Sequence, residues 1–126
     1  MENVIVTLRA APVDCWSCRR EFTIISSIAV AADDETRICS VSDFTAKPGL
    51  LSAVIAETPT PENLGPVKIR SSWTMGSDYL ANICPHCDKL FGQTYEVHAR
   101  YEEYDLAPSE RPAAEGWRDV LRSLPE

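Results

Sequence analysis

The alternation of apolar and polar residues predicts strands over the first third of the chain. From Val4 to Leu8 every second side chain is apolar and falls on one face, so a short strand is expected here, ended by Pro12. Residues 22–30 are mostly apolar and β-branched, which favours a second strand. The acidic residues 33–35 predict a turn, and residues 37–41 a short return strand.

A helix is predicted over residues 48–57. Its apolar side chains recur at helical spacing along one face: Leu50, Leu51, Val54 and Ile55. Pro59 and Pro61 follow directly. Because proline lacks a backbone donor and cannot continue a helix, residues 58–63 are expected to form a surface loop.

The second half of the chain begins with another alternating stretch. Residues 67–74 predict a strand whose buried face carries Val67, Ile69, Ser71 and Trp73. Residues 76–78 are expected to turn, and residues 90–104 to form a further strand. Residues 102–114 are polar with two prolines and are expected to be extended. Residues 115–124 predict a terminal helix with an apolar face of Trp117, Val120, Leu121 and Leu124.

Composition limits the classes of partner. The 126 residues fit one domain, and 44% hydrophobic with 25% charged residues is typical of a globular chain. The formal net charge of −7 opposes nucleic-acid binding, although Lys68 and Arg70 form a local basic strip. No apolar run is long enough to span a membrane, and residues 1–3 do not resemble a signal peptide. A reducing cytoplasm is therefore expected.

Two cysteine pairs of identical spacing carry the clearest chemistry: Cys15-Trp-Ser-Cys18 and Cys84-Pro-His-Cys87. Each C-x-x-C turn holds two thiolates close together, and two turns supply the four vertices of a tetrahedral Zn²⁺ site. We therefore predict that Cys15, Cys18, Cys84 and Cys87 are zinc ligands. Four thiolates leave no open coordination position, so no catalysis is expected at the metal. The fifth cysteine, Cys39, is expected to be buried and inert.

Strands, a central helix and two cysteine turns together predict a β-rich α+β fold. We expect a zinc-ribbon-like pair of cysteine knuckles on β-hairpins, with a helical insertion at about residues 31–66 and a short C-terminal helix. Residues 1–105 are expected to form the single domain and residues 106–126 a tail.

The cysteine motifs and their surroundings resemble a family of uncharacterised bacterial zinc-ribbon proteins. That family pairs a Cys-Trp-x-Cys turn with a Tyr-x-Ala-Asn-x-Cys-Pro-x-Cys segment and a later Gly, matched here by Tyr79, Ala81, Asn82, Cys84, Pro85, Cys87 and Gly92. The resemblance covers roughly residues 13–97. It implies a zinc-bound fold and no established activity. Asp88 stands where the family has Gly.

The roles of several residues near the cysteines have more than one interpretation. Cys84 and Cys87 could form a thiol-disulfide redox pair, because Cys-Pro-His-Cys also occurs in thiol oxidants. His86 is expected to face solvent, and His98 to be a surface residue in a strand. The side chain of Asn82 is expected to cap the turn that enters Cys84. Four aromatic residues are expected to pack against the metal rather than form a binding platform: Trp16, Trp73, Tyr79 and Phe91.

These features predict a non-catalytic, cytoplasmic protein-interaction module built around structural zinc. One alternative is an acidic inhibitor or accessory protein that docks on a basic partner, using residues 33–35 and the acidic residues at 102, 103 and 105. A second is the redox enzyme described above. A third is a nucleic-acid binder that uses Lys68 and Arg70. A homodimer formed through an exposed strand edge is a further alternative.

Overall fold

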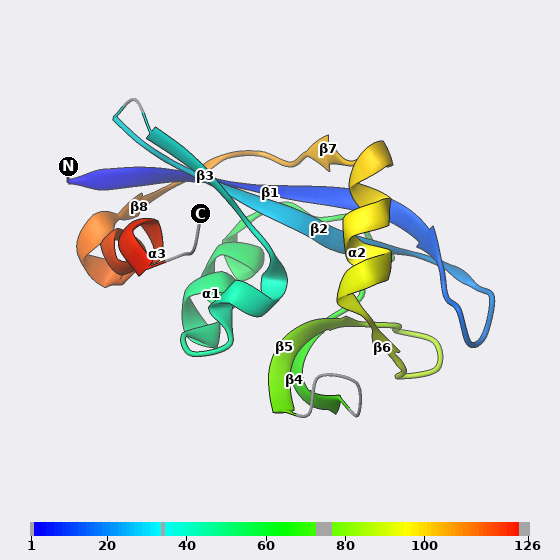
Figure 1. The fold of residues 1–126 in the computed structure, drawn as a ribbon. Helices are drawn as coiled ribbons and strands as arrows, with labels where there is room; N and C mark the ends of the chain where they lie inside the picture. Colours follow the sequence, from blue (N-terminus) through cyan, green and yellow to red (C-terminus); the bar gives the residue numbers. More distant parts are fainter. Residues whose placement is uncertain (1, 34, 73–76, 124–126) are drawn as a thin grey trace.

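The computed structural model describes residues 2–33, 35–72 and 77–123 (Figure 1). Its larger sheet is antiparallel and has the order β3-β2-β1-β7, with β8 also paired to β1. The strands are β1 (Asn3–Asp14), β2 (Glu21–Ala32), β3 (Glu35–Cys39), β7 (Tyr104–Asp105) and β8 (Ser109–Pro112). The smaller sheet has the order β4-β5-β6, with bounds Val67–Ser72, Ser77–Ile83 and Leu90–Phe91. The β-rich character predicted from the sequence is confirmed.

The α-helices are α1 (Pro48–Glu57), α2 (Gln93–Ala99) and α3 (Trp117–Ser123), and α2 packs against β1 and β2 of the larger sheet. Shorter 3-10 turns lie at Val41–Phe44, Arg100–Glu102 and Ala113–Glu115. The helix predicted over residues 48–57 is confirmed, since Leu51 and Val54 are buried on its inner face. Within the described chain, each helix is too short or too polar to cross a membrane.

The β1–β2 hairpin is the longest element of the fold and runs the length of the molecule (Figure 1). The prediction that Pro12 ends the first strand is wrong, because β1 continues to Asp14. Pro12 lies opposite Thr23, whose N–H donates to the Asn63 carbonyl and whose carbonyl accepts from the Gly65 N–H. The backbone groups of Thr23 therefore point away from β1, and no ladder bond is lost at the proline.

The main core lies between this hairpin, α1 and α3. Alternate residues of β1 point into it, as the period of two predicts, and the buried side of α3 closes it with Trp117, Val120 and Leu121. The rings of Phe44 and Trp117 meet edge to face with centroids 5.7 Å apart. Leu124, the remaining member of the predicted apolar face of α3, lies outside the described residues.

The strand predicted over residues 90–104 is wrong in most of its length, because residues 93–99 form α2. A strand would have placed Tyr95 and Val97 together on a buried face. In the helix both are about half exposed, at 48% and 52%, and the buried residue is Glu96. The sequence pattern pointed to a strand because the inner face of this helix is polar.

β4 does not have the buried face that its alternating sequence predicts. Ile69 is 43% exposed, and Val67 is only partly buried. Trp73, the aromatic member of the same predicted face, lies outside the described residues. Because β4 is an edge strand paired only with β5, few side chains are available to cover it.

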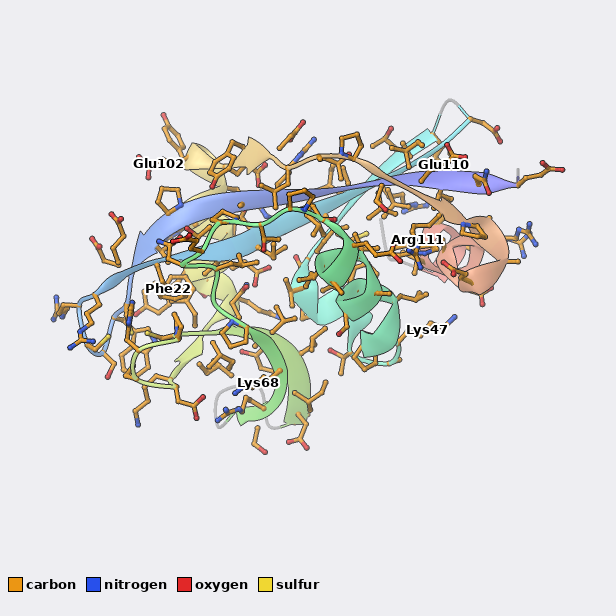
Figure 2. The ribbon with its side chains drawn as sticks, turned by 180° about the vertical axis from the view of Figure 1, so that it is seen from behind. Phe22, Lys47, Lys68, Glu102, Glu110 and Arg111 are labelled. Carbon is orange, nitrogen blue, oxygen red and sulfur yellow. The ribbon has the colours of Figure 1, made fainter. Side chains whose placement is uncertain are left out.

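The segment after residue 105 packs into the same sheet and core. β8 pairs with residues 3–6 of β1, and α3 follows it with Trp117 fully buried. Arg111 of β8 holds the helices in place, since its guanidinium bonds to Glu57 of α1 and to Glu115 (Figure 2). The short helix predicted for the C-terminus is present at Trp117–Ser123.

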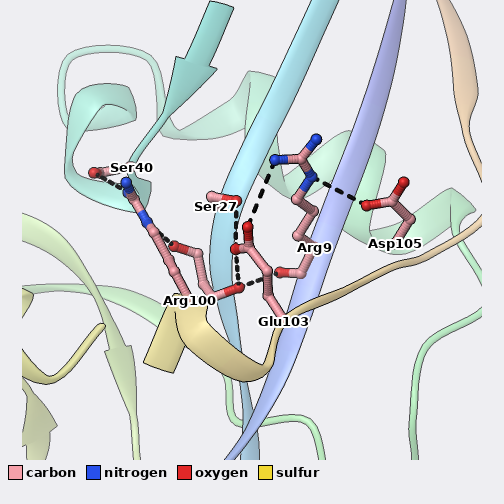
Figure 3. Close-up of polar contacts among 7 residues, drawn as sticks. Arg9, Ser27, Ser40, Arg100, Glu103 and Asp105 are labelled. Carbon is pink, nitrogen blue, oxygen red and sulfur yellow. Dashed lines mark hydrogen bonds and ion pairs between the residues drawn. The ribbon is translucent and has the colours of Figure 1, made fainter. Parts of the chain in front are cut away.

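A β-bulge in β2 joins the large sheet to the segment after α2. The register shifts by one residue after Arg9, so Ser26 has no partner in β1. Its hydroxyl lies 3.2 Å from the Arg9 carbonyl oxygen and 2.8 Å from Glu103 Oε1, while its own carbonyl accepts from Arg100 Nε (Figure 3). Glu103 also pairs with the Arg9 guanidinium. The acidic residue at 103 therefore stabilises the bulge instead of lying free on the surface.

Candidate metal centre

The two cysteine turns lie side by side at one end of the molecule (Figure 1). The first connects β1 to β2 and the second connects β5 to β6. Both have the same backbone hydrogen bonds. The Cys15 N–H donates to the Arg20 carbonyl at 2.9 Å, and the Cys84 N–H donates to the Lys89 carbonyl at the same distance. The residue after each second cysteine is left-handed, with φ of 66° at Arg19 and 63° at Asp88.

The four sulfur atoms converge on one point. Cys15 Sγ lies 3.6 Å from Cys87 Sγ, Cys18 Sγ lies 3.7 Å from Cys84 Sγ, and all four sulfurs are within 4.8 Å of one another. A regular tetrahedron with Zn–S bonds of about 2.3 Å has edges of about 3.8 Å. The cluster therefore has the size that a four-coordinate thiolate site needs. All five cysteines are free, so no disulfide competes for the sulfurs.

Backbone N–H groups point at the first sulfur of each pair. The Ser17 N–H lies 3.4 Å from Cys15 Sγ, and the His86 N–H lies 3.4 Å from Cys84 Sγ. Such donors stabilise negative charge on sulfur and orient the ligand. The two turns thus supply both the sulfurs and part of the surroundings that a metal thiolate requires.

The pKa values of the two buried thiols of the cluster, Cys15 and Cys84, are shifted in opposite directions. Burial raises the pKa of Cys15, but hydrogen bonds from the backbone N–H groups of Cys18 and Ser17 and from the side chains of Cys87 and Cys84 together outweigh burial and lower that pKa to about 7. Burial raises the pKa of Cys84 to about 12, and the adjacent sulfurs add to the rise. A cation at the centre would compensate the charge of neighbouring thiolates. The donor set, four soft sulfurs at tetrahedral spacing, fits a thiophilic cation such as Zn²⁺.

A second, smaller core lies directly beneath the cysteines. It consists of Ala11, Cys15, Phe22, Ile24, Cys84 and Phe91, with Cys18 and Cys87, the other two cysteines of the cluster, packed against it. The rings of Phe22 and Phe91 meet edge to face with centroids 5.5 Å apart. Phe91 is therefore a packing residue at the metal centre, as predicted. Tyr79 is also buried, at 7% exposed.

Each cysteine turn is braced by a side chain from the other. Trp16 Nε1 of the first turn donates to the Leu90 carbonyl, just after the second turn, at 2.8 Å. His86 Nε2 of the second turn lies 3.1 Å from the Glu21 carbonyl, just after the first, and donates to it. The prediction that Trp16 packs into the core is wrong, because 45% of it is exposed. Trp16 stays at the surface because its indole N–H bonds to the Leu90 carbonyl in an exposed hydrogen bond.

Asn82 has a role that the sequence did not reveal. Instead of capping the turn that enters Cys84, its fully buried amide accepts from the Ile25 N–H and donates to the Ile25 carbonyl and to Glu96 Oε2. Glu96 Oε1 lies 3.4 Å from the Val41 N–H. These contacts fasten β5 and α2 to β2 next to the metal centre. An Asn and a Glu at these positions gave no signal, because their partnership depends on chain segments that are distant in sequence.

Two other residues singled out from the sequence lie away from the sulfurs. Cys39 is fully buried in the main core, as predicted, and burial raises the pKa of its thiol to about 12. His98 is an exposed residue, as predicted, but lies on α2 instead of in a strand. Among the described residues, the four cysteines form the one cluster of His, Cys, Asp and Glu side chains spaced to hold a metal ion.

Comparisons with models of known protein families, with curated proteins and with solved structures find no match to this chain. The geometry of the cysteine cluster is therefore the feature of this chain that points to a function.

Proposed function

We propose that this protein is a zinc-binding module in which Cys15, Cys18, Cys84 and Cys87 hold one structural Zn²⁺, and that its role is non-catalytic protein interaction. The observation that carries the proposal is the convergence of four sulfurs within 4.8 Å from two turns of matching hydrogen bonding and backbone conformation. Bound zinc would supply a cross-link between the β1–β2 and β5–β6 hairpins, and its four thiolate ligands would leave no position for substrate.

A zinc-ribbon assignment is part of this proposal. Each cysteine turn lies within an antiparallel hairpin, and α1 comes from the chain between the two hairpins. These features agree with the resemblance to the bacterial zinc-ribbon family described above. The cytoplasmic location inferred from the sequence agrees with five free thiols, since reducing compartments keep cysteines available for metals.

Two rival functions receive less support. A redox pair at Cys84 and Cys87 would need an accessible, low-pKa thiol, whereas Cys84 is 1% exposed and burial raises its pKa to about 12. A nucleic-acid surface at Lys68 and Arg70 would need free cations, whereas both side chains pair with Asp88. We therefore propose a protein as the partner.

Metal analysis of cysteine variants tests the zinc site. Protein purified without chelator is expected to contain one zinc per chain. Each of Cys15→Ser, Cys18→Ser, Cys84→Ser and Cys87→Ser removes a thiolate, so each is expected to lose its zinc to a competing chelator at much lower chelator concentration than the wild type.

The matched control is Cys39→Ala, which removes the one cysteine outside the cluster and is expected to leave zinc content unchanged. Wild-type protein without zinc would refute the proposal. So would loss of zinc from Cys39→Ala as readily as from Cys84→Ser.

A further inference from the structure

A groove of about 550 Å³ lies beside the first cysteine turn, between α2 and the ends of β1 and β2 that meet at that turn. Its apolar lining consists of Pro12, Val13, Phe91, Tyr95 and Ala99. The volume falls in the range of pockets that bind ligands or anchoring side chains. Phe91 lines the groove and also belongs to the small core beneath the cysteines, so the wall of the groove packs against the proposed metal site.

Three carboxylates line this groove: Asp14, Glu21 and Glu102. Asp14 and Glu21 lie directly opposite each other in the β1–β2 register, where two like charges destabilise a sheet. None of the three carboxylates bonds to another described residue, and no Lys or Arg is among the residues that line the groove. Glu102 lies exposed beside the larger sheet (Figure 2).

Neighbouring carboxylates are neutralised by the chain itself. Glu103 and Asp105 follow Glu102 closely in the chain, and both pair with the Arg9 guanidinium (Figure 3). Glu57 and Glu115 pair with Arg111 in the same way. The groove therefore gathers three carboxylates, and among its lining residues His98 is the one side chain that can carry a positive charge.

The aromatic residues of the groove favour a planar cation. Tyr95 is 48% exposed, and its ring packs against Phe91 with centroids 5.3 Å apart. A guanidinium can stack on an exposed ring and bond to two carboxylates at once, which an ammonium does less well. The combination of an exposed Tyr ring with paired carboxylates thus fits an arginine side chain.

We infer that this groove binds an arginine-bearing segment of a partner protein, with Asp14 and Glu21 pairing with the guanidinium and Tyr95 stacking on it. The inference rests on the proposed function, because it names the surface and the partner class of the interaction module. A nucleic acid is the wrong occupant, since the groove would repel phosphates.

NMR titration of the zinc-loaded, ¹⁵N-labelled chain tests the inference. The probe is the capped peptide Arg-Gly-Arg-Gly-Arg, and its control is the same peptide with neutral citrulline in place of arginine. The arginine peptide is expected to shift the amide signals of Val13, Tyr95 and Ala99, while the citrulline peptide leaves them unchanged. The combined variant Asp14→Asn and Glu21→Gln is expected to weaken binding roughly tenfold, because two charge-assisted contacts are lost.

Glu2→Gln is the control, since Glu2 is exposed, its carboxylate pairs with none of the described residues, and it lies just before the opposite end of β1, so its loss should not change binding. Equal shifts with the citrulline peptide, or none with the arginine peptide, would overturn the inference. Tighter binding of spermidine at the same residues would assign the groove to a small amine instead of a protein. Zinc content measured on the same sample separates the two proposals: zinc-loaded protein without shifts refutes only the groove.

Discussion

The left-handed backbone at Arg19 and Asp88 shows how the cysteine turns constrain single residues. Both positions have positive φ, a region that costs a residue with a Cβ about 1–2 kcal/mol. Aspartate tolerates this conformation better than most residues, but arginine does not. The turn still forms at Arg19, because the Arg19 N–H donates to the Cys15 carbonyl and the sulfurs are held by the second turn.

Arg19→Gly is therefore expected to stabilise the zinc-loaded protein by about 1 kcal/mol, because glycine adopts positive φ without steric cost. The measurement is chemical denaturation at fixed free zinc. Arg20→Gly is the control, since Arg20 does not have positive φ and glycine there should destabilise through added chain entropy. A stability unchanged or lowered by Arg19→Gly would mean that the left-handed turn carries no strain.

At the residue scale the sequence predicted which cysteines cluster, but not the hydrogen bonds that hold the two turns together. Spacing alone identifies Cys15, Cys18, Cys84 and Cys87 as candidate ligands, because two residues between cysteines is a local geometric requirement. The bonds from Trp16 to the Leu90 carbonyl and from His86 to the Glu21 carbonyl depend on how the two turns face each other. No local pattern encodes that arrangement.

The docking of α2 depends on a buried carboxyl. Glu96 is 3% exposed, and burial raises its pKa from 4.5 to about 7 despite hydrogen bonds from Val41 and Asn82 and the nearby charge of Arg100. Asp43 adds to the rise. Between pH 4.5 and pH 7 the folded protein thus holds a proton that the unfolded chain has released. This carboxyl stabilises the fold most below about pH 4.5, and its contribution falls as the pH rises to about 7.

Glu96→Gln removes this titration while keeping the shape of the side chain. The free energy of unfolding of the wild type is expected to fall relative to that of Glu96→Gln as the pH rises from 5 to 7, by up to about 1.4 kcal/mol per pH unit. Denaturant titrations of both proteins at several pH values measure this difference. The comparison uses the slope of the free energy of unfolding against pH. A pH-independent loss of stability caused by the substitution therefore does not affect it. Parallel pH profiles would show that Glu96 does not titrate in this range.

Elements with apolar inner faces were predictable, and those with polar inner faces were not. α1 and α3 bury apolar residues such as Leu51, Val54 and Trp117, so the helical spacing of their apolar positions can be recognised in the sequence. α2 buries Glu96, and its exposed Tyr95 and Val97 imitate the alternation of a strand. The bulge at Ser26 was also invisible, because the groups that satisfy it come from residues 100 and 103.

The described residues form two cores of different character. The larger one packs β1, β2, α1 and α3 around Trp117 and contains mainly aliphatic and aromatic side chains together with Cys39. The smaller one is built around Phe22 and Phe91 and includes Cys15 and Cys84, with Cys18 and Cys87 packed against it. Because the smaller core has so few apolar side chains, the proposed zinc would supply a cross-link there, as is common for small domains.

Removing zinc with a chelator is expected to open the smaller core first. Hydrogen-exchange protection should be lost at the amides of Cys15 and Cys84, whose bonds close the two turns. The amides of Leu106 and Ala113 bond to the Leu8 and Glu2 carbonyls beside the larger core and should stay protected. Loss of protection at all four amides together would show a single cooperative unit, and no loss at any would show that the metal does not support the fold.

X-ray absorption at the zinc edge of the purified protein would decide whether the four cysteine sulfurs bind one zinc ion. A tetrathiolate site is expected to show a single shell of four sulfur atoms at about 2.3 Å from zinc. Nitrogen or oxygen atoms at about 2.0–2.1 Å in that shell, or a protein that carries no zinc, would contradict it.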